Sequence, residues 1–379
     1  MTTVTDHSLK PSDVAPRARA LGLEGFDHLE WWVGNARAFA AFLASGFGFD
    51  VVAYAGPETG HADRISYLLE QGGIRWVVTS ALTPRSPIME HVKIHGDGVH
   101  DIAFRVRDAA GAYDEVLRRG GVGLQAPELI DDADGRVVVA SVATYGDTQH
   151  TFVERGAYHG VFLPGFEPAS LPAPDGAPVG LRVMDHVVGN VPLGQLDHWV
   201  GFYEKVFGFD QLTHFDDEQI STEYSALMST VVWDGGRIVM PINEPAAGRH
   251  KSQIEEYLDY YGAPGVQHVA LRTDDIVAAV RALRSRGVRF LTVPPTYYED
   301  ARRRMAGVDL PWADLAQLGI LVDRDHDGHL LQIFTETVTG RPTVFLEIIQ
   351  REGARGFGEG NFKALFEAIE REQARRGNL

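Results

Sequence analysis

The sequence predicts an α+β fold that is built from two similar modules in tandem. The chain repeats several of its own segments, and each copy alternates strand and helix patterns in the same order. Between the copies lies the segment 160–180, which holds five prolines and has the composition of a linker. A chain of 379 residues also exceeds the usual size of one compact core, so two domains are expected.

The internal repeat is visible in two pairs of segments. GFDHLE at 25–30 resembles VMDHVV at 183–188, and in both copies Gly-Asn and then FGFD follow. The segment 95–122 likewise parallels the segment 261–288. Because the matching segments occur in the same order at similar spacing, we interpret them as one duplication with small insertions.

Each copy predicts a strand, a helix and then three strands. β-Branched and aromatic residues predict the first strand at 29–33 and at 183–188. Apolar residues on a common face predict the helices that follow, at 36–44 and 196–206. Further strands are predicted near 53, 65–69 and 75–79, with counterparts at 222–228 and 238–242. The later helices each end at a glycine, as helices commonly do, and lie at 109–119 and 275–286.

Composition narrows the class of protein. Hydrophobic residues make up 44%, which is ordinary for a globular fold and argues against extensive disorder. A net charge of −17 disfavours a nucleic-acid partner, because phosphate backbones are bound by clustered Lys and Arg. It suits a protein that acts on small molecules. No apolar run reaches about 18 residues, so we expect no contact with a membrane.

The chain has no cysteine, which excludes disulfides, thiolate metal ligands, iron–sulfur centres and a cysteine nucleophile. This is compatible with a cytoplasmic location, which we take as the expectation. Residues 1–20 lack the apolar core of a signal peptide and are expected to be a disordered lead-in. The predicted domains are therefore 21–159 and 181–379, joined by the linker 160–180.

Three segments of the second copy each carry one potential metal ligand. They are His186 in DHVVGN, His268 in GVQHVAL and Glu347 in FLEIIQ. Two histidines and one carboxylate are the set that holds Fe(II) with one face open to a substrate and dioxygen. Any one of the 15 histidines, taken alone, is more often a surface or hydrogen-bonded core residue. No local motif joins the three, so only the fold could bring them together.

The repeat offers a comparison at these three positions. The aligned pairs, second copy against first, are His186 and His28, His268 and Asp101, and Glu347 and Thr151. The first copy lacks the complete set, so we expect one site, in the second copy. Glu347 stands among apolar strand residues, where an inward carboxylate is unfavourable unless it is paired or bound to a metal. Strand alternation equally allows it to face outward.

Six segments of the second copy resemble 4-hydroxyphenylpyruvate dioxygenases, and weaker resemblance extends through the first copy. The segments are TEYSALMS (222–229), PINEP (241–245), KSQIEEYLDYYGAPGVQHVAL (251–271), LLQIF (330–334), RPTVFLEIIQR (341–351) and FGEGNFKALFEAIE (357–370). The resemblance implies the vicinal oxygen chelate, or glyoxalase-like, fold. In that fold tandem βαβββ modules curl into half-barrels, and the first module is non-catalytic. It further implies a C-terminal amphipathic lid helix at 361–376.

The resemblance also implies the residues of the site. Fe(II) would be held by His186, His268 and Glu347. The polar residues that address the substrate, which we also assign as catalytic, would be Ser229, Asn243 and Gln267. Supporting amides, the wall of the pocket and its gate would be formed by Gln253, Gln332, Pro241, Phe334, Phe345, Phe357, Phe362 and Asn361. Phenylalanines supply a flat apolar slot, and neutral amides bond a phenol without charging a buried site. Without the resemblance, these phenylalanines would be interpreted as ordinary core packing.

The implied reaction converts 4-hydroxyphenylpyruvate and O2 to homogentisate and CO2, a step of tyrosine catabolism. One alternative is 4-hydroxymandelate synthase, which uses the same substrate and iron but hydroxylates the benzylic carbon; PINEP and GNFKAL favour the dioxygenase. A second alternative is a non-catalytic small-molecule-binding protein of the same fold. As partners we expect the substrate, O2 and further copies of this chain, in a homodimer or homotetramer.

Two positions depart from the family pattern, and two local motifs fail. Glu359 and Glu336-Thr337 stand where a lysine and Lys-Pro are usual, and both changes remove positive charge near the expected gate. The segment 323–328 begins like a calcium loop, but the twelfth position of that loop is Phe334 and not glutamate. We therefore predict a turn there. The glycine-rich segment 356–360 has neither a Walker nor a dinucleotide arrangement.

Overall fold

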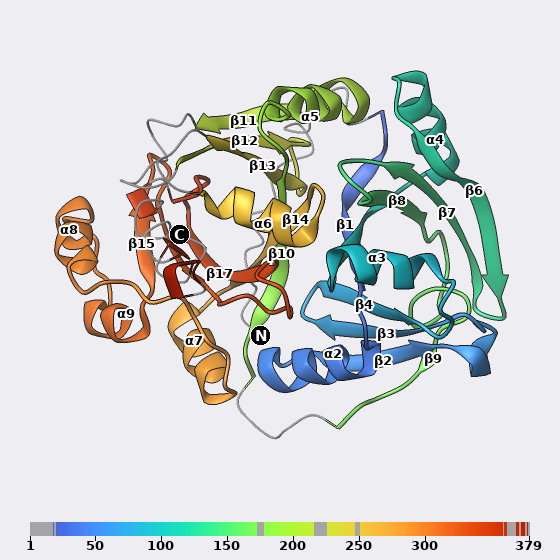
Figure 1. Ribbon diagram of the computed structural model, residues 1–379, viewed down its shortest axis with the longest axis horizontal. Coiled ribbons are helices and arrows are strands. Elements are labelled where there is room, and N and C mark those ends of the chain that lie inside the picture. The colour runs from blue at the N-terminus through green and yellow to red at the C-terminus, as the bar shows by residue number, and fades with distance from the viewer. Residues whose placement is uncertain are drawn as a thin grey trace.

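The computed structural model describes residues 18, 20–172, 178–215, 226–246, 251–358, 360–361, 369–370, 373–375 and 377. These residues form two curled sheets that lie next to each other, each closing about half of a barrel (Figure 1). Helices pack against both sheets. The α+β fold with two half-barrels that the sequence predicts is confirmed.

The first sheet has the spatial order β6-β7-β8-β5-β1-β4-β3-β2-β9. Its strands are β1 Leu23–Trp32, β2 Asp50–Ala55, β3 Arg64–Gln71, β4 Ile74–Ala81, β5 Gly98–Val106, β6 Gly123–Asp132, β7 Gly135–Ala143, β8 Gln149–Glu154 and β9 Glu167–Pro168. Its helices are α2 Ala36–Phe42, α3 Pro87–His95 and α4 Ala109–Arg118, with a π-helix at Leu43–Phe47 and a 3-10 turn at Pro57–Thr59.

The second sheet has the spatial order β11-β12-β13-β10-β14-β17-β16-β15. Its strands are β10 Leu181–Asn190, β11 Asp210–Phe215, β12 Ala226–Trp233, β13 Val239–Ala246, β14 Gly265–Thr273, β15 Leu321–Arg324, β16 His329–Phe334 and β17 Phe345–Glu352. Its helices are α5 Leu196–Phe202, α6 Gln253–Tyr261, α7 Ile276–Ser285, α8 Tyr297–Arg304 and α9 Trp312–Leu318, with a π-helix at Tyr203–Phe207. Among the described residues, no helix is long and apolar enough to cross a membrane.

The duplication is confirmed by the strand pairing. In the first copy β1 pairs in parallel with β4 and antiparallel with β5, and β5 pairs in parallel with β8. In the second copy β10, β13, β14 and β17 repeat these three pairings in the same order. Both copies also follow their first helix with a π-helix that ends at a left-handed glycine, Gly48 or Gly208, each with φ 74°. Glycine adopts that conformation without a steric penalty.

Several elements differ from the sequence-based expectation. The β6–β7 hairpin, β11, α8 and α9 were not predicted, and β6 is largely exposed, so it lacks a clear apolar pattern. The first part of the expected linker is not a free spacer, because β9 pairs with β2 and Phe162 packs against Ala53 and Leu68 of the first sheet. Aromatic side chains in this proline-rich segment bury apolar surface, which outweighs the linker composition.

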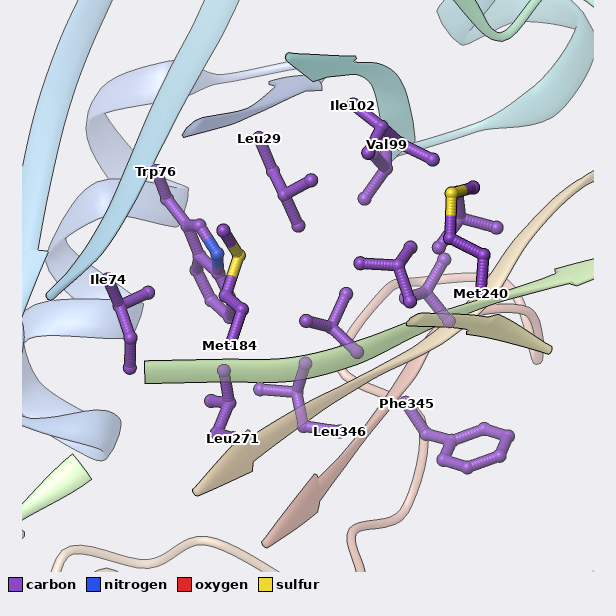
Figure 2. Close-up of a cluster of buried hydrophobic side chains, with 14 of the residues drawn as sticks. Leu29, Ile74, Trp76, Val99, Ile102, Met184, Met240, Leu271, Phe345 and Leu346 are labelled. Atoms are coloured by element: carbon purple, nitrogen blue, oxygen red, sulfur yellow. The ribbon is translucent and has the colours of Figure 1, made fainter. Parts of the chain in front are cut away.

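The two copies share one hydrophobic core. Leu29 and Trp76 of the first copy belong to the same buried cluster as Met184 and Leu271 of the second (Figure 2). Fully burying one such side chain stabilises the fold by about 1.5–3 kcal/mol, so the cluster fixes the two sheets to each other. Gln71 adds a polar tie, because its side-chain oxygen accepts a 2.9 Å hydrogen bond from the Leu181 amide at the start of β10. The first copy thus holds β10 in place.

Candidate metal centre

Three neighbouring strands bring the predicted metal ligands together. His186 on β10 is paired with Ala270 on β14, and Glu347 on β17 is paired with the same alanine. Paired residues point to the same side of a sheet, and His268 lies two residues before Ala270, on that same side. The register therefore places three side chains that are far apart in sequence on one face of one sheet.

The ligand atoms lie close together. Nε2 of His186 is 3.3 Å from Oε2 of Glu347, and Nε2 of His268 is 3.4 Å from the same oxygen. All three residues are buried, with exposed fractions of 3%, 8% and 3% for His186, His268 and Glu347. Ligand atoms that bind one ion at about 2.1 Å each are roughly 3 Å from their neighbours. The donor set and its spacing therefore fit one metal ion.

The charges at this site favour a cation beside Glu347. Burial raises the pKa of the Glu347 carboxyl, but the two facing imidazoles outweigh burial and leave the pKa below its usual value. Burial lowers the pKa of His186, yet the Glu347 and Asp185 carboxylates outweigh it and raise that pKa to about 9. Burial dominates for His268 and lowers its pKa. A divalent ion would supply, in place of protons, the positive charge that this carboxylate needs.

A buried ion pair orients His186. Its Nδ1 lies 2.8 Å from Oδ1 of Asp185, and Arg351 grips the same carboxylate with two hydrogen bonds of 2.7 and 2.8 Å. This arrangement keeps the proton on Nδ1 and leaves Nε2 as the ligand atom. On His268, Nδ1 lies 2.9 Å from Oε1 of Gln267, and its Nε2 likewise faces the carboxylate.

Aromatic side chains surround the two histidines. Phe345 stacks on His268 with ring centroids 4.7 Å apart, and Phe334 meets the same imidazole edge-on at 6.2 Å. Phe357 lies edge-on to His186 at 5.3 Å. The structure thus brings three of the four phenylalanines predicted for the wall next to the ligands. The fourth, Phe362, lies outside the described residues.

Ser229 and Asn243 extend the same face as one polar row. They are paired with each other across β12 and β13, and Asn243 is also paired with Asn190 of β10. Asn190 is four residues after His186 on a strand that alternates, so both point to the same side. Pro241 lies two residues before Asn243 and shares its face. All of these residues are buried.

A β-bulge sets the direction of Gln267. Val188 is paired with His268 and Gly189 with Val266, so Gln267 is left without an opposite residue. Such a bulge re-aims a side chain and lets two successive residues serve one site. Gln267 lines a cavity together with Gln253 at the start of α6 and Phe345.

The described C-terminal residues reach the same region. Ile369 lines the cavity that Gln253 and Gln267 share. Gln332 is buried directly under Gly358, where an added Cβ would lie 2.5 Å from its Nε2. Asn361 is buried as well, and its Oδ1 meets the Tyr297 hydroxyl of α8 at 2.5 Å. Glu359 and most of the expected lid helix at 361–376 fall outside the described residues.

Glu336 lines the same cavity, and its carboxylate is paired with Arg289 at 3.0 Å, so its negative charge has a partner. Asp325 accepts hydrogen bonds from the backbone amides of Asp327 and Gly328, which closes the turn between β15 and β16. The turn predicted in place of a calcium loop is confirmed.

Both copies match known protein families. Residues 18–162 match the family model described as hydroxyphenylpyruvate dioxygenase, N-terminal, and residues 183–333 match the glyoxalase, bleomycin resistance protein and dioxygenase superfamily. The 4-hydroxyphenylpyruvate dioxygenase of Dictyostelium discoideum is 48% identical over 367 residues, covering 94% of this chain and 100% of the relative. That of Yarrowia lipolytica is 46% identical over 371 residues, covering 94% and 93%. The chain belongs to the 4-hydroxyphenylpyruvate dioxygenase family.

Solved structures agree with this membership. A mutant of 4-hydroxymandelate synthase from Streptomyces coelicolor superimposes with a TM-score of 0.83 at 38% identity, covering 93% of this chain and 99% of that one. A fusion of a xylose isomerase-like barrel with a 4-hydroxyphenylpyruvate dioxygenase superimposes with a TM-score of 0.73 at 25% identity, covering 94% and 53%. The dioxygenase family consists of oxidoreductases. Its superfamily and the geometry of the His-His-Glu set together assign a metal centre to this chain.

In this member of the 4-hydroxyphenylpyruvate dioxygenase family, Asn190 is a further residue of the site that was not predicted from the sequence. Asn190 is 0% exposed, and neither its side-chain oxygen nor its nitrogen has a hydrogen-bond partner. A buried amide without partners is unfavourable, so Asn190 is placed to bond a ligand or an ordered water. Gly-Asn after a strand is typical of a turn, which hid this residue. The recurrence of Gly-Asn in both copies was the available signal.

Proposed function

We propose that this protein is an Fe(II)-dependent dioxygenase that converts 4-hydroxyphenylpyruvate and O2 to homogentisate and CO2. The observation that carries the proposal is the buried set of His186, His268 and Glu347 beneath an aromatic wall. Relatives named 4-hydroxyphenylpyruvate dioxygenase match this chain over nearly their whole length.

The donor set supports iron. Two imidazoles and one carboxylate, with no thiolate available anywhere in the chain, suit a non-haem Fe(II) centre with positions left for substrate and oxygen. When bound, Fe(II) supplies a Lewis acid for the 2-oxo acid and the electrons that activate O2. Asp185 and Arg351 hold His186 in the tautomer that exposes Nε2, and Gln267 does the same for His268.

The remaining residues of the pocket bind and orient the substrate. Phe334, Phe345 and Phe357 form the slot for the aromatic ring and exclude water from it. Ser229, Asn243 and Gln267 offer uncharged donors and acceptors to the phenol and to the keto-acid end. Gln253 and Gln332 support that polar network. Holding the ring at one fixed distance from the metal determines which carbon is hydroxylated.

A second candidate function is 4-hydroxymandelate synthesis. It is favoured by one observation, the superposition on a 4-hydroxymandelate synthase at 38% identity. Both reactions use the same substrate and the same kind of metal centre, so the metal ligands do not separate them. The pocket residues Pro241 and Asn243 follow the dioxygenase pattern, and this favours homogentisate.

Product analysis tests the proposal directly. The purified chain is loaded anaerobically with Fe(II), supplied with 4-hydroxyphenylpyruvate and air, and its products are separated by chromatography while O2 uptake is recorded. Homogentisate and CO2 in equal amounts are expected. A product of 4-hydroxymandelate would replace the first function by the second. Substrate binding without any O2 uptake would instead indicate a non-catalytic binding protein.

We further propose four properties of lesser reach. The segment 361–376 acts as a gate over the pocket, supported by Ile369 at the cavity wall.

The chain forms a homodimer or homotetramer, supported by the exposed Leu124 and Leu129 on the edge strand β6, and light scattering during gel filtration measures this. Residues 21–159 and 181–379 are two domains, one for each sheet, that pack against each other through a shared core. The protein is cytoplasmic, in line with the absence of cysteine.

A further inference from the structure

A second group of metal-ligating side chains lies in the first copy. His91 comes from α3, His100 from β5 and Asp147 from the turn between β7 and β8. One ligand atom from each lies within 4.8 Å of the others, the same limit that the three ligands of the catalytic centre meet. The rings of His91 and His100 are 5.6 Å apart, and Nδ1 of His91 is 2.6 Å from Oδ2 of Asp147.

Each of these three residues keeps one buried polar atom without a hydrogen-bond partner. The atoms are Nε2 of His91, Nδ1 of His100 and Oδ1 of Asp147. Both histidines are more than nine-tenths buried. A buried polar atom without a partner is unfavourable in a folded protein, so this cluster is incomplete without a bound ion or ordered water.

The surroundings hold the imidazoles in place and leave one entrance. Trp32 stacks on His100 with ring centroids 3.4 Å apart. His95 places Nε2 at 3.3 Å from Oδ2 of Asp147 and Nδ1 at 2.6 Å from the Tyr261 carbonyl of the second copy. His95 thereby holds the Asp147 carboxylate in place, as ligating carboxylates are commonly held by hydrogen bonds from a neighbouring residue. The Asp147 side chain is 36% exposed, which gives an ion access from solvent.

We propose that His91, His100 and Asp147 bind a second divalent transition-metal ion, of the Zn²⁺ class, apart from the catalytic centre. Two imidazoles and one carboxylate without thiolate form a usual ligand set for such ions, with water in the remaining position. The ion ties α3, β5 and the β7–β8 turn together beside Tyr261 at the end of α6. Its role is therefore structural, at the junction of the two copies. The proposal does not depend on which product the catalytic centre makes.

Metal stoichiometry tests this site. The double variant His186→Ala, Glu347→Ala removes the catalytic centre, and equilibrium dialysis against Zn²⁺ then reports the second site alone. We expect one ion in this background, none after a further His100→Ala, and again one after His198→Ala, which replaces an exposed histidine outside both clusters. Absence of Zn²⁺ from the double variant would show that only ordered water fills the cluster and would overturn the proposal.

A second measurement covers the risk that His100→Ala does not fold. Asp147→Asn replaces a part-exposed side chain by one of equal size, so the packing is kept. In the double-variant background, Zn²⁺ should raise the melting temperature by several degrees, and Asp147→Asn should abolish that rise. Co²⁺ should give the strong visible absorption of a four-coordinate site, and lose it in the same variant. An equal rise with and without Asp147 would place the ion elsewhere and refute the site.

Discussion

The two copies surround their first histidine with the same residues, but only one copy completes a metal-ligand set. In each, an aspartate holds the histidine Nδ1, an arginine grips the aspartate with two hydrogen bonds, and a phenylalanine lies edge-on to the imidazole under that arginine. The first copy uses Asp27, His28, Arg155 and Phe162, and the second uses Asp185, His186, Arg351 and Phe357. This network is therefore a part of the duplicated fold.

The difference lies at the other two positions. His28 is paired with Ala103 just as His186 is paired with Ala270, so the two sheets present equivalent faces. In the first copy, Asp101 accepts a 3.0 Å hydrogen bond from the Thr151 amide and another from the hydroxyl of the same residue. The chain thus satisfies this carboxylate with its own donors. A histidine oriented by a carboxylate does not by itself make a metal centre. The side chains at the other two ligand positions determine whether a copy can bind a metal ion.

Replacing the carboxylate at the decisive position should have the largest effect. Glu347→Ala removes one of three ligands, so bound iron and turnover should fall to background while the protein stays folded. Thr151→Ala is the matched control, since it changes the equivalent position of the first copy. Metal analysis and O2 uptake measure both variants. Retained turnover in Glu347→Ala, or lost iron in Thr151→Ala, would contradict the assignment of the site to the second copy.

The two aspartates of the shared network should separate stability from metal binding. Asp27→Asn leaves the largely buried Arg155 and the part-exposed Arg105 without their carboxylate partner and should lower the free energy of unfolding by about 3–5 kcal/mol at unchanged iron affinity. Asp185→Asn should destabilise in the same way and in addition weaken iron binding about 10–100-fold, because His186 loses its orientation. Urea unfolding and competitive chelation measure the two effects. Equal losses of iron affinity in both variants would refute the separation.

A pH dependence should distinguish Asp101 from the metal ligands. Burial raises its pKa to about 6, against lowering by His28 and by the Thr151 and Gln149 hydrogen bonds. The folded state therefore holds this proton more tightly than the unfolded chain, where the pKa of an aspartate has its ordinary value of 3.8. Its contribution to stability is full below that lower value and is lost as the pH rises through 6.

At pH 7 the loss amounts to at most about 3 kcal/mol, taking 1.36 kcal/mol for each pKa unit. Between about pH 4 and pH 7 the original chain should lose this contribution to stability. Asp101→Asn has no proton to lose at this position, so its unfolding free energy should rise relative to that of the original chain over the same range. Urea unfolding at several pH values measures this difference. Two parallel curves would show that Asp101 does not titrate in this range.

The smallest effects should come from the phenylalanines over the two histidines. Phe162 is almost completely buried, and leucine keeps an apolar side chain of comparable size there. Phe162→Leu should therefore lower stability by less than about 1.5 kcal/mol and leave the Michaelis constant unchanged. Phe357 is half-buried beside the metal ligands, so Phe357→Leu should mainly raise the Michaelis constant for 4-hydroxyphenylpyruvate. Steady-state kinetics and thermal melting assign each effect. A raised Michaelis constant in Phe162→Leu would contradict the assignment of a structural role to Phe162 and a substrate-binding role to Phe357.

Much of the fold and of the ligand set could be predicted because the duplication makes residues comparable. Alignment of the two copies by sequence alone separates His268 and Glu347 from Asp101 and Thr151, and the strand register supports the same equivalences. The inward direction of Glu347, which alternation alone left open, follows from its pairing with Ala270.

Other features depend on tertiary context that no local pattern carries. Gln267 faces the site only because a bulge interrupts the alternation of β14. Asn190 resembles a turn residue until its pairing with Asn243 is known. Phe162 lies in a proline-rich segment, and its packing on the first sheet could not be predicted from composition. In each case a contact with a distant strand overrides the local preference.

The parallel pairing of β14 with β17 has a consequence for how the enzyme is made. The first sheet has all of its strands except the short β9 once Glu154 has been synthesised, whereas the second sheet is complete only after β17, which ends at Glu352. During translation the first copy can fold as a unit while Glu347 has not yet been synthesised. We therefore expect the nascent chain to hold a folded half with no complete metal site until β17 has been synthesised.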